Sequence, residues 1–323
     1  MKPSDHTSDA FESPHDTLSL GEVLDALDAV SDLPPVKAAT SFVARLGLAR
    51  LRASARALLR DRPPRDIDPF GLDPAFLARL LPIARWFHDR YFRVECRGLE
   101  HIPDTGRVLL VANHSGTLPY DAAMVFSAVH FQHPAHRHVR ALVEDFTYHL
   151  PWLGSFMTRV GAVRACPENA LRLLEADEAT LVFPEGVKGI GKLYSKRYRL
   201  QRFGRGGAIR LAARAHAPIV PVSIVGAEEA MPLLSRVSWL AAPLGLPYIP
   251  VTPTLPWLGL AGLIPYPTKW FIDFGAPMDV SDLDLDGLAS DRVVVNRLNE
   301  ELRARVQALV DARLASRNSV LFG

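Results

Sequence analysis

From Tyr91 onward the sequence alternates between short apolar runs and longer segments with helical spacing, and this alternation limits the fold more than any other feature. The apolar runs expected to be strands cover residues 92–96, 107–112, 139–143, 180–183, 219–225 and 270–274. The helices expected between them cover residues 120–129, 170–175 and 206–215. Such alternation is typical of α/β folds. We therefore expect a mixed, partly parallel sheet that is covered by helices.

The first part of the chain lacks this alternation and divides by charge. Residues 1–35 are expected to form an acidic polar tail, because the first 32 residues hold eight acids and one base, Lys2. Residues 36–91 are expected to form an N-terminal helical extension. Its first part is strongly basic, since residues 33–60 hold six bases and no acid. A basic helix with an apolar stripe suits an anionic membrane surface, and an ordinary solvated helix is the alternative.

Residues 92–323 are expected to form the remaining part, the α/β domain. It is expected to end in an amphipathic helix from Ser290 to Ser316, with Leu298, Leu302 and Val306 on one stripe. The charge-free stretch from Val237 to Thr268 holds seven prolines, so it cannot form one helix through a bilayer. It could be a buried irregular segment or a surface that dips into a membrane.

Composition excludes several classes of protein. The formal net charge of the 323 residues is +2, which gives no nucleic-acid signature. The two cysteines are too few for a disulfide framework and fit a reducing compartment. Neither a signal peptide nor a membrane-spanning helix is expected, because no basic leader precedes an apolar run and no run of 18 apolar residues occurs. The strong preference for arginine over lysine suggests a bacterial source.

A histidine and an aspartate frame the turn after the second expected strand. On one continuous helix His114 and Asp121 would lie roughly 10 Å apart along the axis. If residues 116–118 form a loop and a helix starts near Pro119, Asp121 can reach the imidazole. A carboxylate there would make His114 a competent general base. Alternatively, His114 ends a strand and Asp121 merely caps a helix.

A second polar turn follows the expected strand at residues 180–183. Glu185 and Gly186 stand in this turn, and seven basic residues follow it before Gly206. Such a segment suits a phosphate or an anionic surface, and a solvated loop is the alternative. The sequence from Gly186 to Lys192 also satisfies G-x-x-x-x-G-K, but Leu193 lacks the hydroxyl that a P-loop needs, so nucleotide binding is a minor alternative.

Four histidines in the segment just before the third expected strand raise the question of a metal site. Their spacing is irregular and no cysteine accompanies them, so no metal site is expected. The four are His130, His133, His136 and His138.

Taken together, the two polar turns resemble the glycerolipid acyltransferase superfamily, which includes the 1-acylglycerol-3-phosphate acyltransferases. The first family motif is matched by Asn113, His114 and Asp121, and the third by Phe183 to Gly186. Arg164 matches the arginine of the second motif, and Pro221 lies in an apolar strand that matches the fourth. The resemblance covers about residues 92–280. Six residues separate His114 from Asp121 where the family usually has four.

The resemblance implies an acyltransferase that moves a fatty acyl group from acyl-CoA or acyl-carrier protein to a lipid hydroxyl. A lysophospholipid such as 1-acylglycerol-3-phosphate is the implied acceptor, with a neutral acceptor such as diacylglycerol, or noncatalytic lipid binding, as alternatives. His114 and Asp121 would be catalytic. Arg164, Glu185, Gly186 and Lys188 would bind the acceptor. No metal or cofactor beyond the acyl donor is implied, nor is nucleic acid. The protein would lie peripherally on the cytoplasmic face of the cell membrane.

Overall fold

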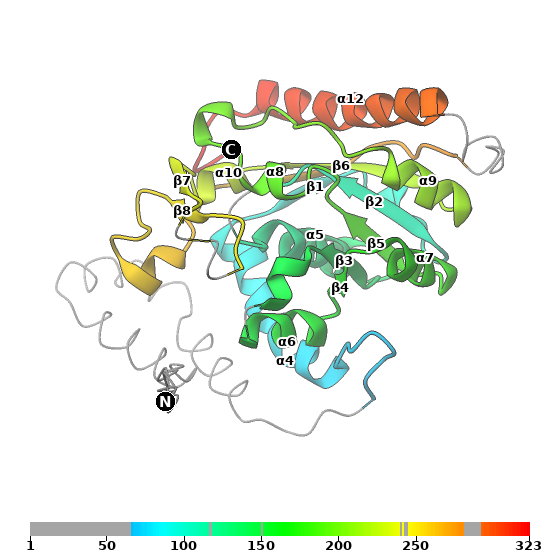
Figure 1. Ribbon diagram of the computed structural model, residues 1–323, viewed down its shortest axis with the longest axis horizontal. Helices are drawn as coiled ribbons and strands as arrows, with labels where there is room; N and C mark the ends of the chain where they lie inside the picture. Colours follow the sequence, from blue (N-terminus) through cyan, green and yellow to red (C-terminus); the bar gives the residue numbers. More distant parts are fainter. Residues whose placement is uncertain (1–65, 116–117, 150, 240, 242–244, 281–291) are drawn as a thin grey trace, which may run out of the picture. The chain divides into compact units, whose positions relative to one another are not determined.

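A seven-stranded sheet forms the centre of the computed structural model (Figure 1). The structure describes residues 66–115, 118–149, 151–239, 241, 245–280 and 292–323, all within the compact unit Ala53–Gly323. The strands are β1 (Glu95–Arg97), β2 (Val108–Ala112), β3 (Val139–Val143), β4 (Val163–Arg164), β5 (Ala179–Val182), β6 (Ile219–Val225) and β9 (Phe271–Phe274). Their order across the sheet is β1-β9-β6-β2-β5-β3-β4. Every neighbouring pair is parallel except β6 with β9, so the expected mixed sheet is confirmed.

The central strands are apolar on both faces because helices cover both faces of the sheet. Every residue of β2 and of β6 is buried. Near-continuous apolar runs of this kind are the signature of a doubly covered, largely parallel sheet. Pro221 is tolerated inside β6 because the pairing with β9 begins only at Val222, where it lies opposite Phe274.

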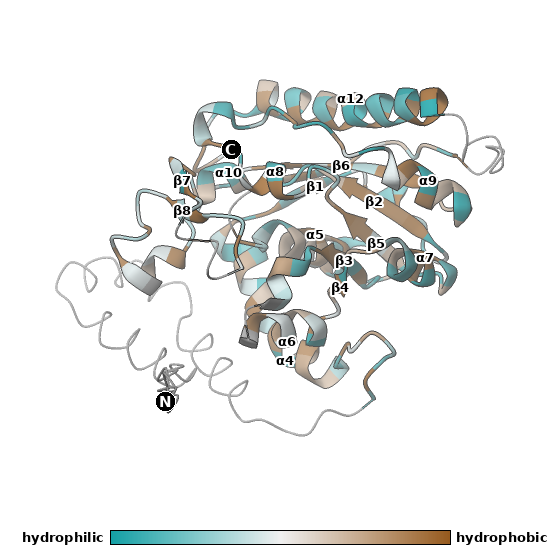
Figure 2. Cartoon of the chain, in the orientation of Figure 1, coloured by the Kyte–Doolittle hydropathy of each residue, from teal (hydrophilic) through white to brown (hydrophobic). Residues whose placement is uncertain are grey.

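Helices pack on the two faces with separate apolar cores. On one face α5 (Tyr120–Gln132) packs against Val108, Leu110 and Ala112 of β2. On the other face, α9 (Gly207–Arg214) and α12 (Arg292–Ser316) pack against Leu109 and Val111. Figure 1 shows α12 and α5 on opposite sides of the sheet. Figure 2 shows β2 in brown and most of α12 in teal, as expected of a buried strand and a surface helix.

The expected C-terminal amphipathic helix is present as α12. Leu302, Val306 and Val310 are fully buried on one stripe, and Leu298 packs against the same core. Near its end, Arg313 is buried and donates from Nε to the Asp273 carboxylate of β9 over 2.8 Å. An apolar stripe and one buried ion pair thus hold α12 to the sheet.

The remaining elements surround this centre. The helices and helical turns are α4 (Pro74–Trp86), η1 (Phe87–Tyr91), η2 (Leu99–His101), η3 (Asp145–His149), α6 (Pro151–Arg159), α7 (Pro167–Glu175), α8 (Val187–Ile190), η4 (Tyr194–Lys196), α10 (Ala227–Ala230) and η6 (Gly259–Leu263). A separate two-stranded antiparallel sheet joins β7 (Ser235–Val237) and β8 (Ile249–Val251). Among the described residues, no helix is both long enough and apolar enough to cross a bilayer. The acidic tail and the basic helix expected before residue 66 lie outside the described residues.

The parallel strands bring both polar turns to the same end of the sheet, where the carboxyl ends of the strands lie. β2 and β5 pair directly, with Val111 opposite Val182, and each strand ends within one residue of this pair. Asn113 and His114 follow β2, and Glu185 follows β5 after a short turn. Carboxyl ends of parallel strands are where α/β folds bind ligands.

Candidate active site

His114 and Asp121 are in direct contact. The His114 Nδ1 lies 2.6 Å from Asp121 Oδ2, although six residues separate them in the chain. The helix α5 begins at Tyr120, immediately after Pro119, so Asp121 lies in its first turn. The expected helix start near Pro119 is therefore confirmed, and the capping-only interpretation of the pair does not describe this geometry.

Backbone N–H groups hold the Asp121 carboxylate in place. Ser115 donates its N–H to Oδ2 over 3.1 Å, and Ala122 donates its N–H to Oδ1 over 2.8 Å. The Asp121 side chain is completely buried, whereas that of His114 is 16 % exposed. A carboxylate in the first turn of a helix is also favoured by the helix dipole. Asp121 is thus a fixed anion behind a histidine that reaches solvent.

His114 is held from two further directions. Its backbone N–H donates to Glu185 Oε1 over 2.9 Å. Its ring stacks on Phe183, with 4.3 Å between the ring centroids and 20° between the planes. The preceding Asn113 bridges to β6, because its amide exchanges hydrogen bonds with both the N–H and the carbonyl of Ile224. Both polar turns therefore fix the orientation of one imidazole.

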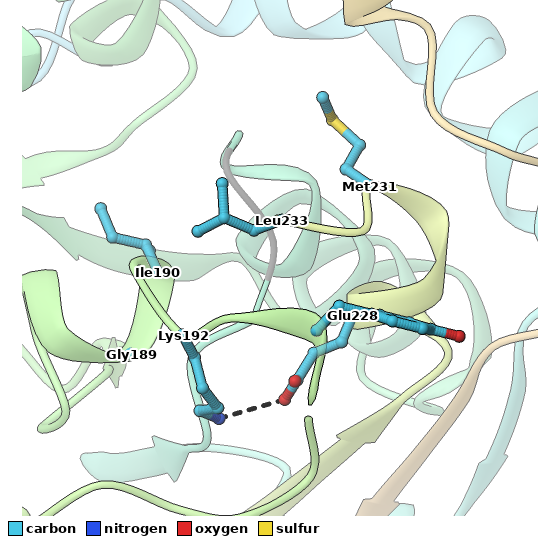
Figure 3. A pocket seen from close by; sticks show the side chains of 7 residues that line it. Gly189, Ile190, Lys192, Glu228, Met231 and Leu233 are labelled. Carbon is cyan, nitrogen blue, oxygen red and sulfur yellow. Dashed lines mark hydrogen bonds and ion pairs between the residues drawn. The ribbon is translucent and has the colours of Figure 1, made fainter. Parts of the chain in front are cut away.

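Glu185 belongs to a buried cluster of charges. Its Oε2 accepts from the N–H of Gln201 over 2.6 Å and lies 3.5 Å from the Lys192 ammonium. The same ammonium lies 3.1 Å from Glu228 Oε1 (Figure 3). Burial raises the pKa of Glu228, and Lys192 opposes that increase. The Glu185 side chain is fully buried, so it supports the two turns instead of facing solvent.

The Lys192 geometry decides the P-loop interpretation. A P-loop lysine reaches the phosphates of a nucleotide. Here the Lys192 ammonium is 98 % buried and lies between two carboxylates, in a cluster next to a cavity of only about 10 Å³. Phosphates would meet Glu185 and Glu228 at this position, so Lys192 does not have the geometry of a P-loop lysine.

Two glycines let α8 approach the pair closely. A Cβ at Gly189 would lie 2.7 Å from the Cβ atoms of both His114 and Glu185. Gly186 has a φ of +55°, a conformation that side chains rarely adopt, and a Cβ there would lie 3.1 Å from Glu144 Oε1. Gly186 therefore shapes the turn, and Gly189 seals α8 against it.

The other expected site residues do not touch the histidine. Arg164 ends β4, three strands away from β2, or about 14 Å at ordinary strand spacing. Its Nε and a terminal nitrogen bind both oxygens of Asp145 at 2.5 and 2.7 Å, and 62 % of its side chain is exposed. Lys188 is an exposed residue of α8. The structure thus brings together His114, Asp121, Glu185 and Gly186 and leaves the two cations at the surface of the same end of the sheet.

Sequence reasoning missed Lys192, Glu228 and Gly189 as parts of this site. Lys192 is one of only six lysines and ends the G-x-x-x-x-G-K sequence, and neither signal pointed to a buried ion pair. Its partner Glu228 is 36 residues away and meets it only because β6 crosses next to β2. Gly189 was one glycine among several in a basic loop, and only the packing of α8 distinguishes it.

The four histidines before β3 do not converge. His133 bonds through Nε2 to the carbonyl of Ile102, and His136 through Nδ1 to the carbonyl of His130. Across the described residues, no group of three or more potential ligands has the arrangement of a metal site.

Comparison with known proteins shows which family the chain resembles. Residues 93–225 match the family model described as Acyltransferase. Uncharacterized proteins from Mycobacterium bovis and Mycobacterium tuberculosis are 46 % identical over 279 residues, which cover 85 % of this chain and 78 % of theirs. A protein from Mycobacterium leprae has the same identity and is covered over 76 % of its length. Among solved structures, the 1-acyl-sn-glycerophosphate (LPA) acyltransferase of Thermotoga maritima aligns with a TM-score of 0.48 at 19 % identity, over 86 % of this chain and 94 % of that one.

Proposed function

The chain belongs to the glycerolipid acyltransferase superfamily, and we propose that it transfers a fatty acyl group from a thioester to a lipid hydroxyl. The donor in this proposal is acyl-CoA or an acyl-carrier protein, with no metal or further cofactor. The acceptor is a lysophospholipid such as 1-acylglycerol-3-phosphate. The observation that carries the proposal is the 2.6 Å contact between a partly exposed His114 and the buried Asp121, inside the matched family segment.

The geometry suits general-base catalysis at one atom. With Asp121 accepting the Nδ1–H, the His114 Nε2 carries the free lone pair that takes the acceptor's hydroxyl proton. The alkoxide attacks the thioester carbonyl, so a C–O bond forms as the C–S bond breaks. The leaving thiolate then takes the proton from the imidazolium. Throughout, Asp121 stabilises the cationic ring, and Phe183 and Glu185 keep it oriented.

In this proposal Lys188 and Arg164 are the cations available to an acceptor phosphate. Glu185 and Gly186 shape the turn between β5 and α8. A neutral acceptor such as diacylglycerol is the second candidate. The observation that favours it is the bidentate pair of Arg164 with Asp145, which a phosphate would have to displace. We also propose a peripheral location on the cytoplasmic face of the cell membrane, where either lipid acceptor would be found.

The test is an acyl-transfer assay with long-chain acyl-CoA against lysophosphatidate, other lysophospholipids, monoacylglycerol and diacylglycerol. His114→Ala should reduce kcat by about 10²–10⁴ and leave the circular-dichroism spectrum unchanged. His136→Ala, which removes an exposed loop histidine, is the matched control and should keep wild-type activity. Wild-type turnover by purified His114→Ala would refute the proposal, and the preferred acceptor decides between the phosphate-bearing and the neutral lipid.

A further inference from the structure

An exposed apolar surface lies on the segment between β8 and β9. We call residues 252–266 the apolar loop. Its Trp257, Leu258 and Ile264 side chains are 74 %, 59 % and 54 % exposed, and Tyr266 is also exposed. Leu234 is a further exposed apolar side chain. It lies beside the loop, because its N–H bonds to the carbonyl of Val251, the residue before the loop. Contiguous exposure of large apolar side chains marks an interaction site.

Internal hydrogen bonds hold the apolar loop in a defined shape. The Thr252 hydroxyl accepts from the N–H groups of Thr254 and Leu255 at 3.2 and 2.8 Å. The Thr254 hydroxyl donates to the carbonyl of Gly262 over 3.0 Å. Gly262 has no room for a side chain, since a Cβ would lie 2.8 Å from the carbonyl oxygen of Thr254. Trp257 and Leu258 are therefore presented outward by a built loop.

The sequence before and after the apolar loop is strongly positive. Residues 186–272 hold eleven Lys and Arg residues, of which Arg210 and Arg214 lie on α9 away from the loop (Figure 1), and only two acids, Glu228 and Glu229. Both acids are buried, and they bind Lys192 and Arg317. The exposed bases nearest to β7 are Arg236, Lys196 and Arg197, because the N–H of Tyr194 bonds to the carbonyl of Leu233 and joins η4 to β7. A second copy of this surface would bring the same positive charge, whereas an anionic bilayer offers both apolar depth and opposite charge.

The apolar loop adjoins the candidate active site. Tyr120, which precedes Asp121, donates its hydroxyl to the carbonyl of Leu263 over 3.2 Å. On the other side of the site, Leu233 and Tyr248 pack with Ile190 of α8 in one apolar cluster. Figure 1 shows the gold-to-orange segment beside β7 and β8, at the end of the sheet away from α7 and α9. A bilayer on the apolar loop would thus lie next to the His114 turn.

We propose that the apolar loop docks on an anionic phospholipid bilayer, with Trp257 and Leu258 in the headgroup region and the neighbouring bases against lipid phosphates. Tryptophan is enriched at this depth of membranes because its ring is apolar and its N–H stays wet. The inference deepens the proposed function, since an acceptor lipid would then enter from the bilayer beside His114. The charge-free stretch from Val237 to Thr268 was expected to be either a buried irregular segment or a surface that dips into a membrane. The proposal assigns the membrane role to its part from residue 252 onward.

Full-length protein is mixed with vesicles of phosphatidylcholine and phosphatidylglycerol whose acyl chains carry bromine, which quenches tryptophan at the bilayer. Subtracting the emission of Trp257→Phe from that of the wild type isolates the Trp257 signal. We expect vesicles to quench this difference spectrum and shift it to shorter wavelength. An unchanged difference spectrum would overturn the proposal, whatever other segments bind the membrane.

Affinity gives a second readout. Trp257→Ala/Leu258→Ser should weaken vesicle binding about tenfold, while Val293→Ser, at an exposed apolar position of α12, should not change it. Unaltered binding by the double variant, or loss of a dimer in sedimentation instead of loss of vesicle binding, would contradict the bilayer assignment. Neither readout needs turnover, and His114→Ala should bind vesicles as the wild type does. A failure of the proposed activity is therefore separate from a failure of this surface.

Discussion

At the scale of single residues, the candidate site depends on how completely one imidazole is fixed. Asp121 binds its Nδ1, Glu185 binds its backbone N–H, and Phe183 covers one ring face. These contacts leave the Nε2 side for a substrate. A catalytic group held within a fraction of an ångström loses little entropy on reaching the reactive geometry, which is where much of an enzyme's rate advantage arises.

Replacing Asp121 with Asn should impair this arrangement without removing a single heavy atom. Both oxygens of the carboxylate accept hydrogen bonds from backbone N–H groups. An amide NH2 at the Oδ2 position would therefore face the N–H of Ser115, and two donors would meet. It would also donate to His114 Nδ1, which puts the ring proton on Nε2 and removes the base. We expect kcat to fall by about 10²–10⁴ with little change in KM. Steady-state kinetics test this, and Asp121→Asn activity above a tenth of wild type would contradict it.

His138 should make stability depend on pH. Burial, followed by the neighbouring charges of Arg140 and His130, lowers its pKa from 6.5 to about 4. Because the folded-state pKa lies below the unfolded value, the unfolded chain binds the proton first. The stability from neutral His138 is therefore complete above about pH 6.5 and is lost as the pH falls toward 4, by about 3 kcal/mol at most. In urea unfolding between pH 7 and pH 4, the free energy of unfolding should fall less for His138→Gln than for the wild type. The exposed His136→Gln should behave as the wild type, and parallel curves for all three proteins would count against this cause.

At the scale of elements, a helix of only four residues is packed directly against the candidate site. The helix α8 has four residues and contacts the site through Gly189, where there is no space for a methyl group. Gly189→Ala should push α8 away from His114, lower kcat more than tenfold and destabilise the fold by about 1–3 kcal/mol. Gly207→Ala, at the first position of α9, meets nothing within 4 Å and is the matched control. Equal activity and equal melting temperatures for the two variants would show that α8 is not packed as described.

Element prediction from sequence succeeded where burial dominates and failed where it does not. The strands at residues 139–143 and 219–225 were predicted with their observed ends, because each is an apolar run buried in the sheet. The strands β7 and β8 have three residues each, are at most half-buried and include Pro250, so no periodicity could reveal them. The helix α6 was missed as well.

At the scale of the whole molecule, buried charges connect the site to the end of the chain. Glu185, Lys192 and Glu228 form one cluster. The adjacent Glu229 binds Arg317 beyond α12 and accepts from the Tyr198 hydroxyl, and the N–H of Tyr198 donates to Glu228. Loops, the short helix α10 and the C-terminal segment therefore share one network of ion pairs and hydrogen bonds.

Removing Lys192, one of the two cations of that network, should be costly. Lys192→Met would leave two carboxylates buried without their partner and should lower the free energy of unfolding by about 3–5 kcal/mol. Lys196→Met, at an exposed position, should change it by less than about 0.5 kcal/mol. Adding Glu228→Gln to Lys192→Met should recover part of the loss, because one unpaired charge is then gone. Chemical denaturation measures all three, and an unperturbed Lys192→Met would show that the cluster contributes nothing.

The whole-molecule arrangement also explains how far the site could be predicted. His114 and Asp121 are near in sequence, so their contact followed from one assumption about the turn between them. The contact of Glu185 with the His114 backbone needed β2 and β5 to be neighbours. The Lys192–Glu228 pair further needed β6 on the other side of β2, an order that no local pattern encodes.

The position of β1 at one edge of the sheet has a consequence for biosynthesis. Among the described strands β1 pairs only with β9, with Glu95 opposite Phe271, and Arg93 next to it binds the carbonyl of Leu321. A ribosome adding about 5–20 residues per second makes the partner of β1 roughly 9–35 s after β1 itself. During that interval the nascent chain carries an unpaired strand edge, which is a template for association with other chains. Chaperone protection of the polypeptide is therefore needed most before its last fifty residues are translated.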